Sequence, residues 1–273
     1  HQGDEIEIWH ADTMLDYAYG LPVQDGQEWK IGRLTLTALH TPGHTPGHMS
    51  YLLTDPDQHP WIIFTGDALF AGDVGRTDLL GEEAMPDMAE MLYDTLFNRL
   101  IPLGDEVIIC PAHGSGSVCG SGIAERIWTT IGLERKHNGK LQYLEKDTFM
   151  ARVPKMLERP PYFRRTEELN IEGPPILGSV PVVAQLKPRR FWERALLEDS
   201  VVLDTRMELG FGAAHVPNAL SIWQGGLASF AGWFLPYDKP LLLVTPEDDP
   251  TPTVRTLIRL GYDNIAGTLA GGM

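Results

Sequence analysis

Three short segments with strand-like patterns each end at a turn that carries a histidine or an aspartate. The segments are residues 31–39, 61–64 and 107–110, and the turns after them carry His44, Asp67 and His113 in that order. Apolar and polar residues alternate along the first segment and the other two are short apolar runs, which predicts buried or half-buried strands. Because a sheet fixes the loops at its strand ends, we expect the three polar side chains to converge.

These three side chains match the donor set of a metal site. Two imidazoles and one carboxylate offer nitrogen and oxygen ligands that suit Zn²⁺ or non-haem Fe²⁺. Gly43 and Gly66 let the backbone turn sharply beside them. We therefore predict that His44, Asp67 and His113 bind a metal ion.

Each of these residues also has a structural alternative. His40 and His48 flank His44 and compete with it, and the spacing alone does not choose between them. Asp67 has the alternative role of capping the turn through nearby amides. The alternative for His113 is a loop histidine whose ring nitrogens are hydrogen-bonded to neighbouring groups. The three strand ends taken together favour the metal site.

The composition narrows the classes of partner. The chain of 273 residues carries 37 acidic and 22 basic side chains, a net charge of −15, which argues against nucleic acid or an anionic membrane as its main partner. It has no apolar run of the ~20 residues that a membrane span needs. Only two cysteines are present, Cys110 and Cys119, which fits a reducing compartment and predicts a cytoplasmic protein.

The length and the pattern of prolines and glycines indicate two domains. We predict a first domain over residues 1–170, a linker over 171–180 that contains Gly173-Pro174-Pro175, and a second domain over 181–273. In the first domain the periodicity predicts a strand over residues 49–53 and helices over 84–100, 123–136 and 141–151. In the second, the expected helices 188–198 and 250–260 alternate with strands 201–203 and 241–244, which is typical of a parallel α/β sheet.

Four ordered motifs resemble the metallo-β-lactamase superfamily, and most closely its glyoxalase II and persulfide dioxygenase branch. The motifs are Thr41-Pro-Gly-His-Thr45, Thr65-Gly-Asp-Ala-Leu-Phe70, Gly75-Arg-Thr-Asp78 and Pro111-Ala-His-Gly114. The resemblance implies an αββα sandwich with a metal site at one edge of its sheets. The fold class expected for the chain is therefore α/β.

The same resemblance implies roles for individual residues. His44 would be a ligand, Asp67 a ligand that bridges in dinuclear members, and His113 a ligand of a second ion. In the persulfide dioxygenases a single iron is held by two histidines and one aspartate, and the counterpart of His113 lies near the iron without binding it. Arg76 would contact the glutathione part of the substrate, and its alternative is an ion pair with a neighbouring aspartate, Asp78 or Asp73. For Cys119, in a Gly/Ser-rich loop, a buried or unused thiol is the favoured interpretation over contact with a sulfur-containing substrate.

The chain departs from the superfamily pattern in one respect. The His-x-His-x-Asp-His segment that normally precedes the Thr-Pro-Gly-His motif is absent, and His1 and His10 are the only histidines before His40. We expect these residues to be part of a longer chain, with a degenerate, metal-free member as the alternative.

Residues 181–273 resemble a rhodanese domain. The resemblance is carried by Val201-Val-Leu-Asp-Thr-Arg206, Ala214-His-Val-Pro-Asn-Ala219 and the segment from Gly261 to Gly272. Rhodanese chemistry needs a reactive cysteine after a central strand. Here the strand 241–244 is followed by Thr245-Pro-Glu-Asp-Asp-Pro250, so we predict a module that is silent in sulfur transfer and an Asp204–Arg206 pair that anchors its loop.

Together these features predict a metal-dependent enzyme of sulfur metabolism. The favoured activity is the oxidation of glutathione persulfide to sulfite with Fe(II) and O₂. The first alternative is a thioester hydrolase of the glyoxalase II kind, with one or two Zn(II) ions and Asp67 helping to generate a metal hydroxide. The second alternative is a non-catalytic scaffold with degenerate sites. The expected partner is a small thiol-derived substrate, with self-association into a homo-oligomer as a further option.

Overall fold

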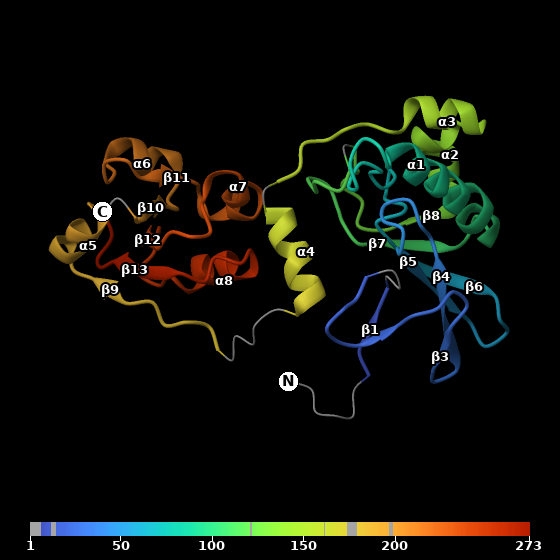
Figure 1. Ribbon diagram of the computed structural model, residues 1–273, viewed down its shortest axis with the longest axis horizontal. Helices are drawn as coiled ribbons and strands as arrows, with labels where there is room; N and C mark the ends of the chain where they lie inside the picture. Colours follow the sequence, from blue (N-terminus) through green and yellow to red (C-terminus); the bar gives the residue numbers. More distant parts are fainter. Residues whose placement is uncertain (1–6, 12–14, 121, 161, 174–178, 197–198) are drawn as a thin grey trace. The chain divides into compact units, whose positions relative to one another are not determined.

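The computed structural model describes residues 7–11, 15–120, 122–160, 162–173, 179–196 and 199–273, which form two compact units (Figure 1). Unit 1 comprises His1–Glu158 and unit 2 comprises Arg159–Met273. The linker expected over 171–180 lies further along the chain than this division, and residues 174–178 lie outside the described residues. The difference arises because the proline-rich stretch contains a helix, α4 (Tyr162–Glu172), between two pairs of prolines.

Unit 1 is built on a six-stranded sheet with the strand order β3-β4-β5-β6-β7-β8. The strands are β3 (Glu28–Ile31), β4 (Leu34–His40), β5 (Met49–Thr54), β6 (Pro60–Gly66), β7 (Ile108–Pro111) and β8 (Thr129–Thr130). Strands β6 and β7 are parallel, and all other neighbours are antiparallel. A separate parallel pair consists of β1 (Trp9–His10) and β2 (Leu21–Pro22). The described residues of unit 1 thus form one six-stranded sheet and one two-stranded sheet.

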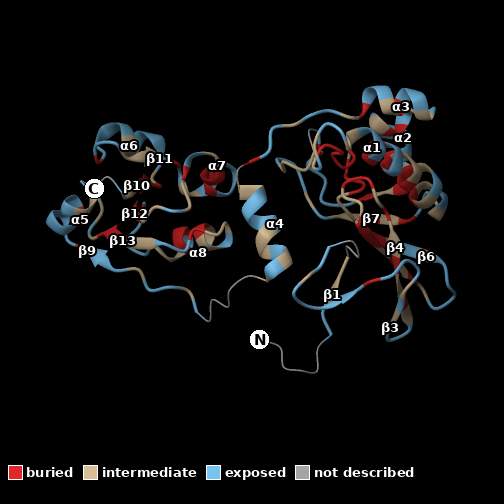
Figure 2. Cartoon of the chain, in the orientation of Figure 1, coloured by how far each residue is buried: buried red, intermediate tan, exposed pale blue. Residues whose placement is uncertain are grey.

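Helices cover one face of the six-stranded sheet. They are α1 (Met85–Asp94), a π-helical extension (Thr95–Leu100), the 3₁₀ turns Ile101–Leu103 and Lys140–Gln142, α2 (Ile131–His137) and α3 (Lys146–Arg152). Their apolar side chains pack with inward-facing strand residues in one core, in which Ile63 and Ile109 meet Leu92, Leu96 and Phe149. Figure 2 shows the buried residues gathered in these strands and in the loops beside them.

Two sequence-based predictions in unit 1 were wrong at their N-terminal ends. The strand expected over 31–39 is interrupted by a hairpin turn, because Gly32 adopts a positive φ of 62° and β4 begins only at Leu34. The helix expected over 123–136 begins at Ile131, where the Thr130 side chain accepts a hydrogen bond from the Leu133 amide and caps the helix. The strands expected over 49–53, 61–64 and 107–110 are confirmed within one or two residues.

The other face of the sheet is also apolar. Its side chains line a shallow groove and are only partly covered in the described residues: Ile31, Leu34, Leu36, Tyr51, Leu53 and Phe64. An antiparallel sheet with one solvated face normally alternates apolar and polar residues. This sheet therefore has the composition of one that is covered on both faces.

Unit 2 is a parallel α/β unit, as the alternation of strands and helices predicted. Its sheet has the order β11-β10-β12-β13-β9, with all neighbours parallel. The strands are β9 (Gln185–Leu186), β10 (Val201–Asp204), β11 (Leu220–Ser221), β12 (Leu241–Val244) and β13 (Ile265–Leu269). The helices are α4, α5 (Pro188–Ala195), α6 (Glu208–Ala213), α7 (Leu227–Phe234) and α8 (Thr251–Arg259), with a 3₁₀ turn at Gln224–Gly226. The helices expected over 188–198 and 250–260 are α5 and α8, and residues 197–198 lie outside the described residues.

The central strand β12 is buried on both faces. Leu241 and Leu243 join a core with residues of α7 and α8, whereas Leu242 and Val244 join a second core that contains Phe191 of α5. This two-sided burial is the physical reason why the strand is a continuous apolar run rather than an alternating one. None of the helices in the described ranges combines the length and the apolar character of a membrane-spanning segment.

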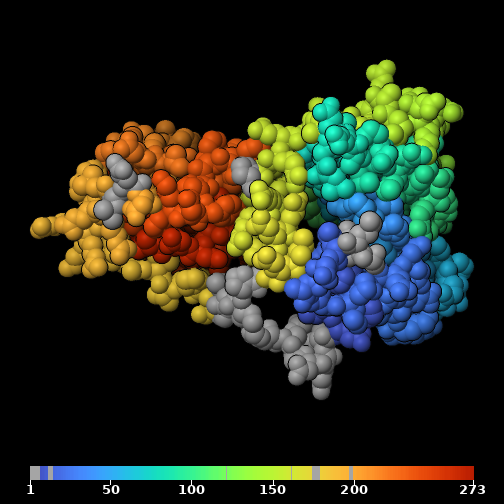
Figure 3. All heavy atoms as spheres, viewed as in Figure 1, coloured from blue at the N-terminus to red at the C-terminus, as the bar shows by residue number. Residues whose placement is uncertain are grey.

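Helix α4 makes a close contact with a glycine of α7 in unit 2. A Cβ atom at Gly232 in α7 would lie 1.9 Å from Cδ1 of Tyr162, so the Tyr162 ring rests directly on the α7 backbone. Most of α4 lies at the surface (Figure 3) and none of its residues is fully buried. The contact between Tyr162 and Gly232 is therefore one attachment of α4 that leaves no room for a side chain.

We predict that Gly232→Ala detaches α4, although alanine is normally favoured over glycine within a helix by about 1 kcal/mol. Gly212→Ala in α6 is the matched control, since nothing lies within 4 Å of a Cβ there, and it is expected to be neutral or stabilising. Hydrogen exchange of the α4 amides measures the effect. Equal protection of α4 in both variants would contradict the assignment.

Candidate metal centre

The three predicted strand ends meet at one edge of the sheet of unit 1. Strands β4, β6 and β7 run in the same direction, so their carboxyl ends lie together. His44 lies in the loop that leaves β4, Asp67 directly follows β6, and His113 lies two residues beyond β7. The structure therefore brings the three residues together, as the sequence predicted.

The His44 imidazole presents one nitrogen to Asp67. Its Nδ1 lies 3.1 Å from the carbonyl oxygen of Arg76 and donates to it, which leaves the lone pair of Nε2 directed at Asp67 Oδ1, 3.8 Å away. A hydrogen bond of this kind on the outer nitrogen is the usual arrangement of a metal-binding histidine. Burial lowers the pKa of His44, and the nearby charge of Asp67, which acts to raise it, offsets this only in part. The lowered pKa favours the neutral imidazole that a metal requires.

The Asp67 carboxylate has an oxygen without a hydrogen-bond donor. Oδ1 is buried, and among the described residues it accepts no hydrogen bond, although two histidines lie near it. Burial alone would raise the pKa of Asp67, but contacts with His113, His44 and His48 hold it below its usual value. Because a buried carboxylate oxygen is rarely left without a partner, this atom fits a cation ligand.

The competition between His40, His44 and His48 is decided by hydrogen bonds. Nε2 of His48 accepts the backbone N–H of Asp67 at 2.9 Å and Nδ1 lies 2.9 Å from the Thr41 carbonyl oxygen, so both nitrogens are engaged. Burial, with the nearby His44 as a further cause, lowers the pKa of His48 to about 4. Nε2 of His40 donates to the Pro46 carbonyl oxygen at 2.7 Å. Of the three, His44 is the one with a ring nitrogen that faces the Asp67 carboxylate and is not hydrogen-bonded elsewhere among the described residues.

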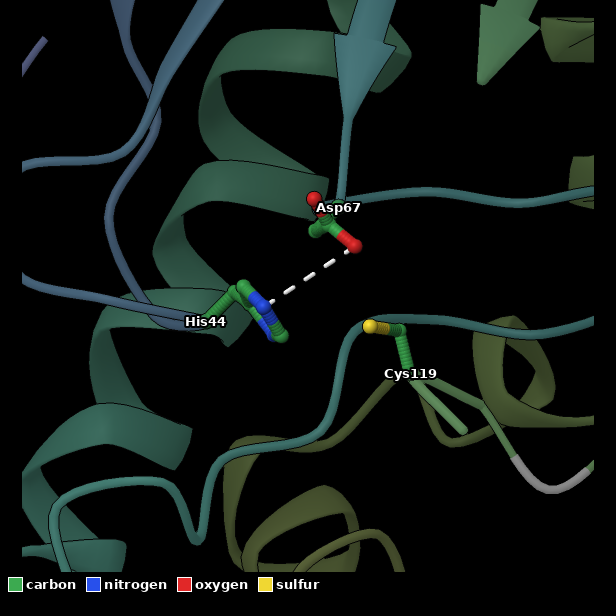
Figure 4. Close-up of side chains that lie close together, drawn as sticks. All are labelled: His44, Asp67 and Cys119. Atoms are coloured by element: carbon green, nitrogen blue, oxygen red, sulfur yellow. Dashed lines mark ion pairs between the residues drawn. The ribbon is translucent and has the colours of Figure 1, made fainter. Parts of the chain in front are cut away.

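His113 and Cys119 complete the surroundings of Asp67. Nε2 of His113 lies 3.1 Å from Oδ1 of Asp67, and contacts with Asp67 and then Cys119 raise the pKa of His113 to about 10. The donor atoms of His44, Asp67 and Cys119 all lie within 4.8 Å of one another (Figure 4). The sequence favoured a Cys119 thiol that is buried or unused, because nothing in its Gly/Ser-rich loop indicates that the loop folds back over the site.

Gly66 is required at the end of β6. It has a positive φ of 53°, and a Cβ atom there would lie 2.5 Å from Nε2 of His48. Nε2 is the atom that accepts the Asp67 amide hydrogen, so a side chain at Gly66 would displace the histidine that positions Asp67. Gly66 is therefore needed for two reasons: its backbone adopts a positive φ, and it leaves room for the His48 ring to lie against it.

Arg76 is buried and engaged within the protein. Its Nε and Nη2 donate to the two carboxylate oxygens of Asp78 at 2.7 Å each, and its side chain is only 2% exposed. Nη1 donates to the Val118 carbonyl oxygen and Nη2 also donates to that of Leu157. This geometry is the ion pair with Asp78 that the sequence offered as the alternative to substrate binding. It does not support the substrate-binding role, because the paired N–H groups with which the guanidinium would bind a substrate carboxylate already bind Asp78.

Comparison with known proteins places this site in a family. Residues 4–113 match the model of the metallo-beta-lactamase superfamily. Unit 1 contains a metallo-β-lactamase domain. The expected metallo-β-lactamase fold and α/β class are thereby confirmed.

Two curated relatives of this domain have different activities. Hydroxyacylglutathione hydrolase GloC of Haemophilus influenzae is 35% identical over 115 residues, which are 42% of this chain and 44% of that protein. Persulfide dioxygenase ETHE1 of Homo sapiens is 34% identical over 93 residues, which are 34% of this chain and 33% of that protein. A hydrolase and a dioxygenase of this superfamily are consistent with the predicted metalloenzyme. The chain spans a little less than half the length of the first of these relatives.

One solved structure matches nearly the whole chain. The metallo-beta-lactamase from Staphylococcus aureus subsp. aureus COL has a TM-score of 0.84 and 27% identity, and the match covers 97% of this chain and 78% of that one. The metallo-β-lactamase domain and the parallel α/β unit thus both have counterparts in one known protein. The individual ligand assignments stay predictions.

We predict that Gly66→Ala weakens metal binding at His44 and Asp67 by about tenfold or more, the usual effect of disturbing a residue that orients a ligand. Gly32→Ala is the matched control, because Gly32 also has a positive φ but nothing lies within 4 Å of a Cβ there. Both variants are expected to lose about 1–2 kcal/mol from the backbone conformation. A titration with Co²⁺ measures the metal affinity of both variants. Equal Co²⁺ affinities of Gly66→Ala and Gly32→Ala would contradict the role of the His48 contact.

We predict that Asp78→Asn destabilises unit 1 by about 3 kcal/mol at pH 7, because it leaves the buried Arg76 charge without its counter-ion. Burial alone would raise the pKa of Asp78, but hydrogen bonds from Arg76 and the Leu157 amide hold it below its usual value. The native pair is therefore fully stabilising above the unfolded pKa of about 4 and loses its contribution as the pH falls through the lower folded pKa.

Urea unfolding, followed by hydrogen exchange of unit 1 peptides, measures this prediction. The difference between the native chain and Asp78→Asn should narrow as the pH falls below about 4. Glu90→Gln, which breaks the exposed pair with Lys146, is the control and should cost less than about 1 kcal/mol. A pH-independent difference would exclude the ion pair as its cause.

Proposed function

We propose that the metallo-β-lactamase domain holds a catalytic Fe(II) through His44 and Asp67 and oxidises glutathione persulfide to sulfite. The observation that supports a metal here is that the buried, unpaired Oδ1 of Asp67 faces Nε2 of His44 at 3.8 Å, while the hydrogen bond of His44 uses its other nitrogen. That separation is too long for a hydrogen bond and suits two ligands of one ion. Non-haem iron oxygenases typically hold their iron through two histidines and one carboxylate, and His44 and Asp67 supply one ligand of each kind.

The net reaction defines what the protein residues must do. Persulfide, O₂ and water give a thiol, sulfite and two protons, with the outer sulfur oxidised and O₂ reduced. An ion held by His44 and Asp67 would supply the redox chemistry through which the persulfide and O₂ react. His48 and Gly66 hold the Asp67 backbone in place, and Arg76 orients His44 through its carbonyl oxygen. His113 lies beside Asp67, with its Nε2 3.1 Å from Oδ1.

The second unit supports a role in sulfur metabolism. We propose that it is a rhodanese-like module without the catalytic cysteine. Its loop Thr245–Pro250 follows the carboxyl end of the central strand β12, where a reactive cysteine would stand, and contains a threonine and three acidic residues instead. The predicted Asp204–Arg206 anchor is confirmed, with Nη2 of Arg206 2.6 Å from Oδ2 of the fully buried Asp204.

A zinc-dependent thioester hydrolase is the second candidate, and one observation favours it. Oδ1 of Asp67 lies near both imidazoles, 3.8 Å from His44 and 3.1 Å from His113, which resembles the position of a carboxylate that bridges two ions. The similarity to hydroxyacylglutathione hydrolase supports the same reading. Asp67 would then help to generate the attacking hydroxide.

The proposal includes the partners and surroundings expected from the sequence. The substrate is a small thiol derivative, not a nucleic acid or a membrane, and self-association into a homo-oligomer stays a proposal as well. Cys110 and Cys119 are both free thiols, which supports a reducing, cytoplasmic setting.

The test compares the two reactions on the same protein. The chain is loaded without oxygen with Fe²⁺ or Zn²⁺, and its metal content, O₂ uptake with glutathione persulfide and cleavage of a glutathione thioester are measured. We expect iron-dependent O₂ uptake that is lost in His44→Ala and kept in His59→Ala, a control at an exposed histidine of the β5–β6 hairpin.

Three outcomes separate the candidates. Thioester cleavage with zinc and no O₂ uptake would replace the dioxygenase by the hydrolase. Neither reaction, with metal still bound through His44, would reject both activities for this chain. Neither reaction and no retained metal would favour the non-catalytic scaffold.

A further inference from the structure

We propose that the thiolate of Cys119 is a sulfur ligand of the ion held by His44 and Asp67. This inference rests on the proposed metal centre and adds to it a donor from a third segment of the chain. It changes the character of the site from nitrogen and oxygen ligands to a mixed set with sulfur.

The geometry places three different donors around one point. An imidazole nitrogen of His44, a carboxylate oxygen of Asp67 and Sγ of Cys119 all lie within 4.8 Å of one another. Figure 4 shows the Cys119 side chain directed towards the space between the other two. Ligand atoms 2.0–2.3 Å from a common ion are typically about 3–4 Å apart, so a small closing movement satisfies all three.

A second observation, independent of the cysteine, points to a ligand in this space. The His44 side chain is 91% buried, since its exposed fraction is 9%, and Nε2 makes no hydrogen bond in the described part of the chain. Oδ1 of Asp67 is also buried without a donor. A buried carboxylate oxygen without a hydrogen-bond partner and an unpaired nitrogen of a buried imidazole, facing the same space, are expected where a cation binds.

The loop that carries Cys119 is held against the site by Arg76. Nη1 of Arg76 donates to the carbonyl oxygen of Val118, the residue before Cys119, and the Arg76 carbonyl oxygen accepts from Nδ1 of His44. The Cys119 amide donates to Oγ of Ser117, which fixes the turn. One buried arginine therefore positions both the imidazole and the thiol, which gives the Gly75-Arg76-Thr77-Asp78 motif a structural purpose.

A thiolate ligand has a spectroscopic signature that nitrogen and oxygen ligands lack. Binding to a divalent ion deprotonates the thiol. Thiolate bound to Co²⁺ then gives a charge-transfer absorption in the near ultraviolet. Cys110 is the matched control, because it is the other free thiol of the chain but is not among the three converging donors.

The experiment titrates the untagged, reduced, full chain with Co²⁺ and records absorption and affinity. We expect a charge-transfer band in the native chain and in Cys110→Ser, and its loss in Cys119→Ser together with a Kd raised by about tenfold or more. Arg76→Lys is expected to weaken the band while Cys119 is still present, because the hydrogen bond to Val118 is lost.

The outcomes distinguish this inference from the proposed function. Binding that depends on His44, without a charge-transfer band and with equal affinity in Cys119→Ser, would overturn the sulfur ligand and leave the metal centre intact. No Co²⁺ binding in the native chain would overturn both. Circular dichroism of each variant shows whether a lost band reflects a lost fold.

Discussion

The buried ion pair between Arg76 and Asp78 is the interaction on which the arrangement of the site depends. Both side chains lie in the loop that follows β6, and they are 2% and 0% exposed. Two charges can be buried at such depth only when their hydrogen bonds are well satisfied. The pair achieves this with carbonyl oxygens of Val118 and Leu157, and it thereby ties distant parts of unit 1 to the loop that follows β6 and begins at Asp67.

The histidines near Asp67 have different roles, which follow from their hydrogen bonds. His48 is neutral and positions the Asp67 backbone, and His44 directs a free nitrogen towards the carboxylate. Their residue type is the same, and only the groups that face each ring nitrogen give them different roles. This explains why one Thr-Pro-Gly-His-Thr-Pro-Gly-His segment can supply both a support and a candidate ligand.

The limits of sequence-based prediction follow from which interactions are local. The strands at 49–53, 61–64 and 241–244 were predictable because burial imposes a pattern on neighbouring residues. The convergence of His44, Asp67 and His113 was predictable because parallel strands end at a shared edge. The place of Cys119 was not, because it depends on a loop that returns to the site through Arg76. Helix α4 was not predicted, because prolines on both sides of it indicated a stretch with little regular structure.

The sequence by itself determined the two α/β units, the strand-end motifs and the residue types available to a metal, since these follow from patterning and chemistry along the chain. Tertiary structure alone decided which histidine faces Asp67, that Arg76 is committed to Asp78, and that a thiol joins the donors. The physical reason is that a hydrogen bond or an ion pair between segments has no periodicity in sequence. It is defined only when the sheet has brought the loops together.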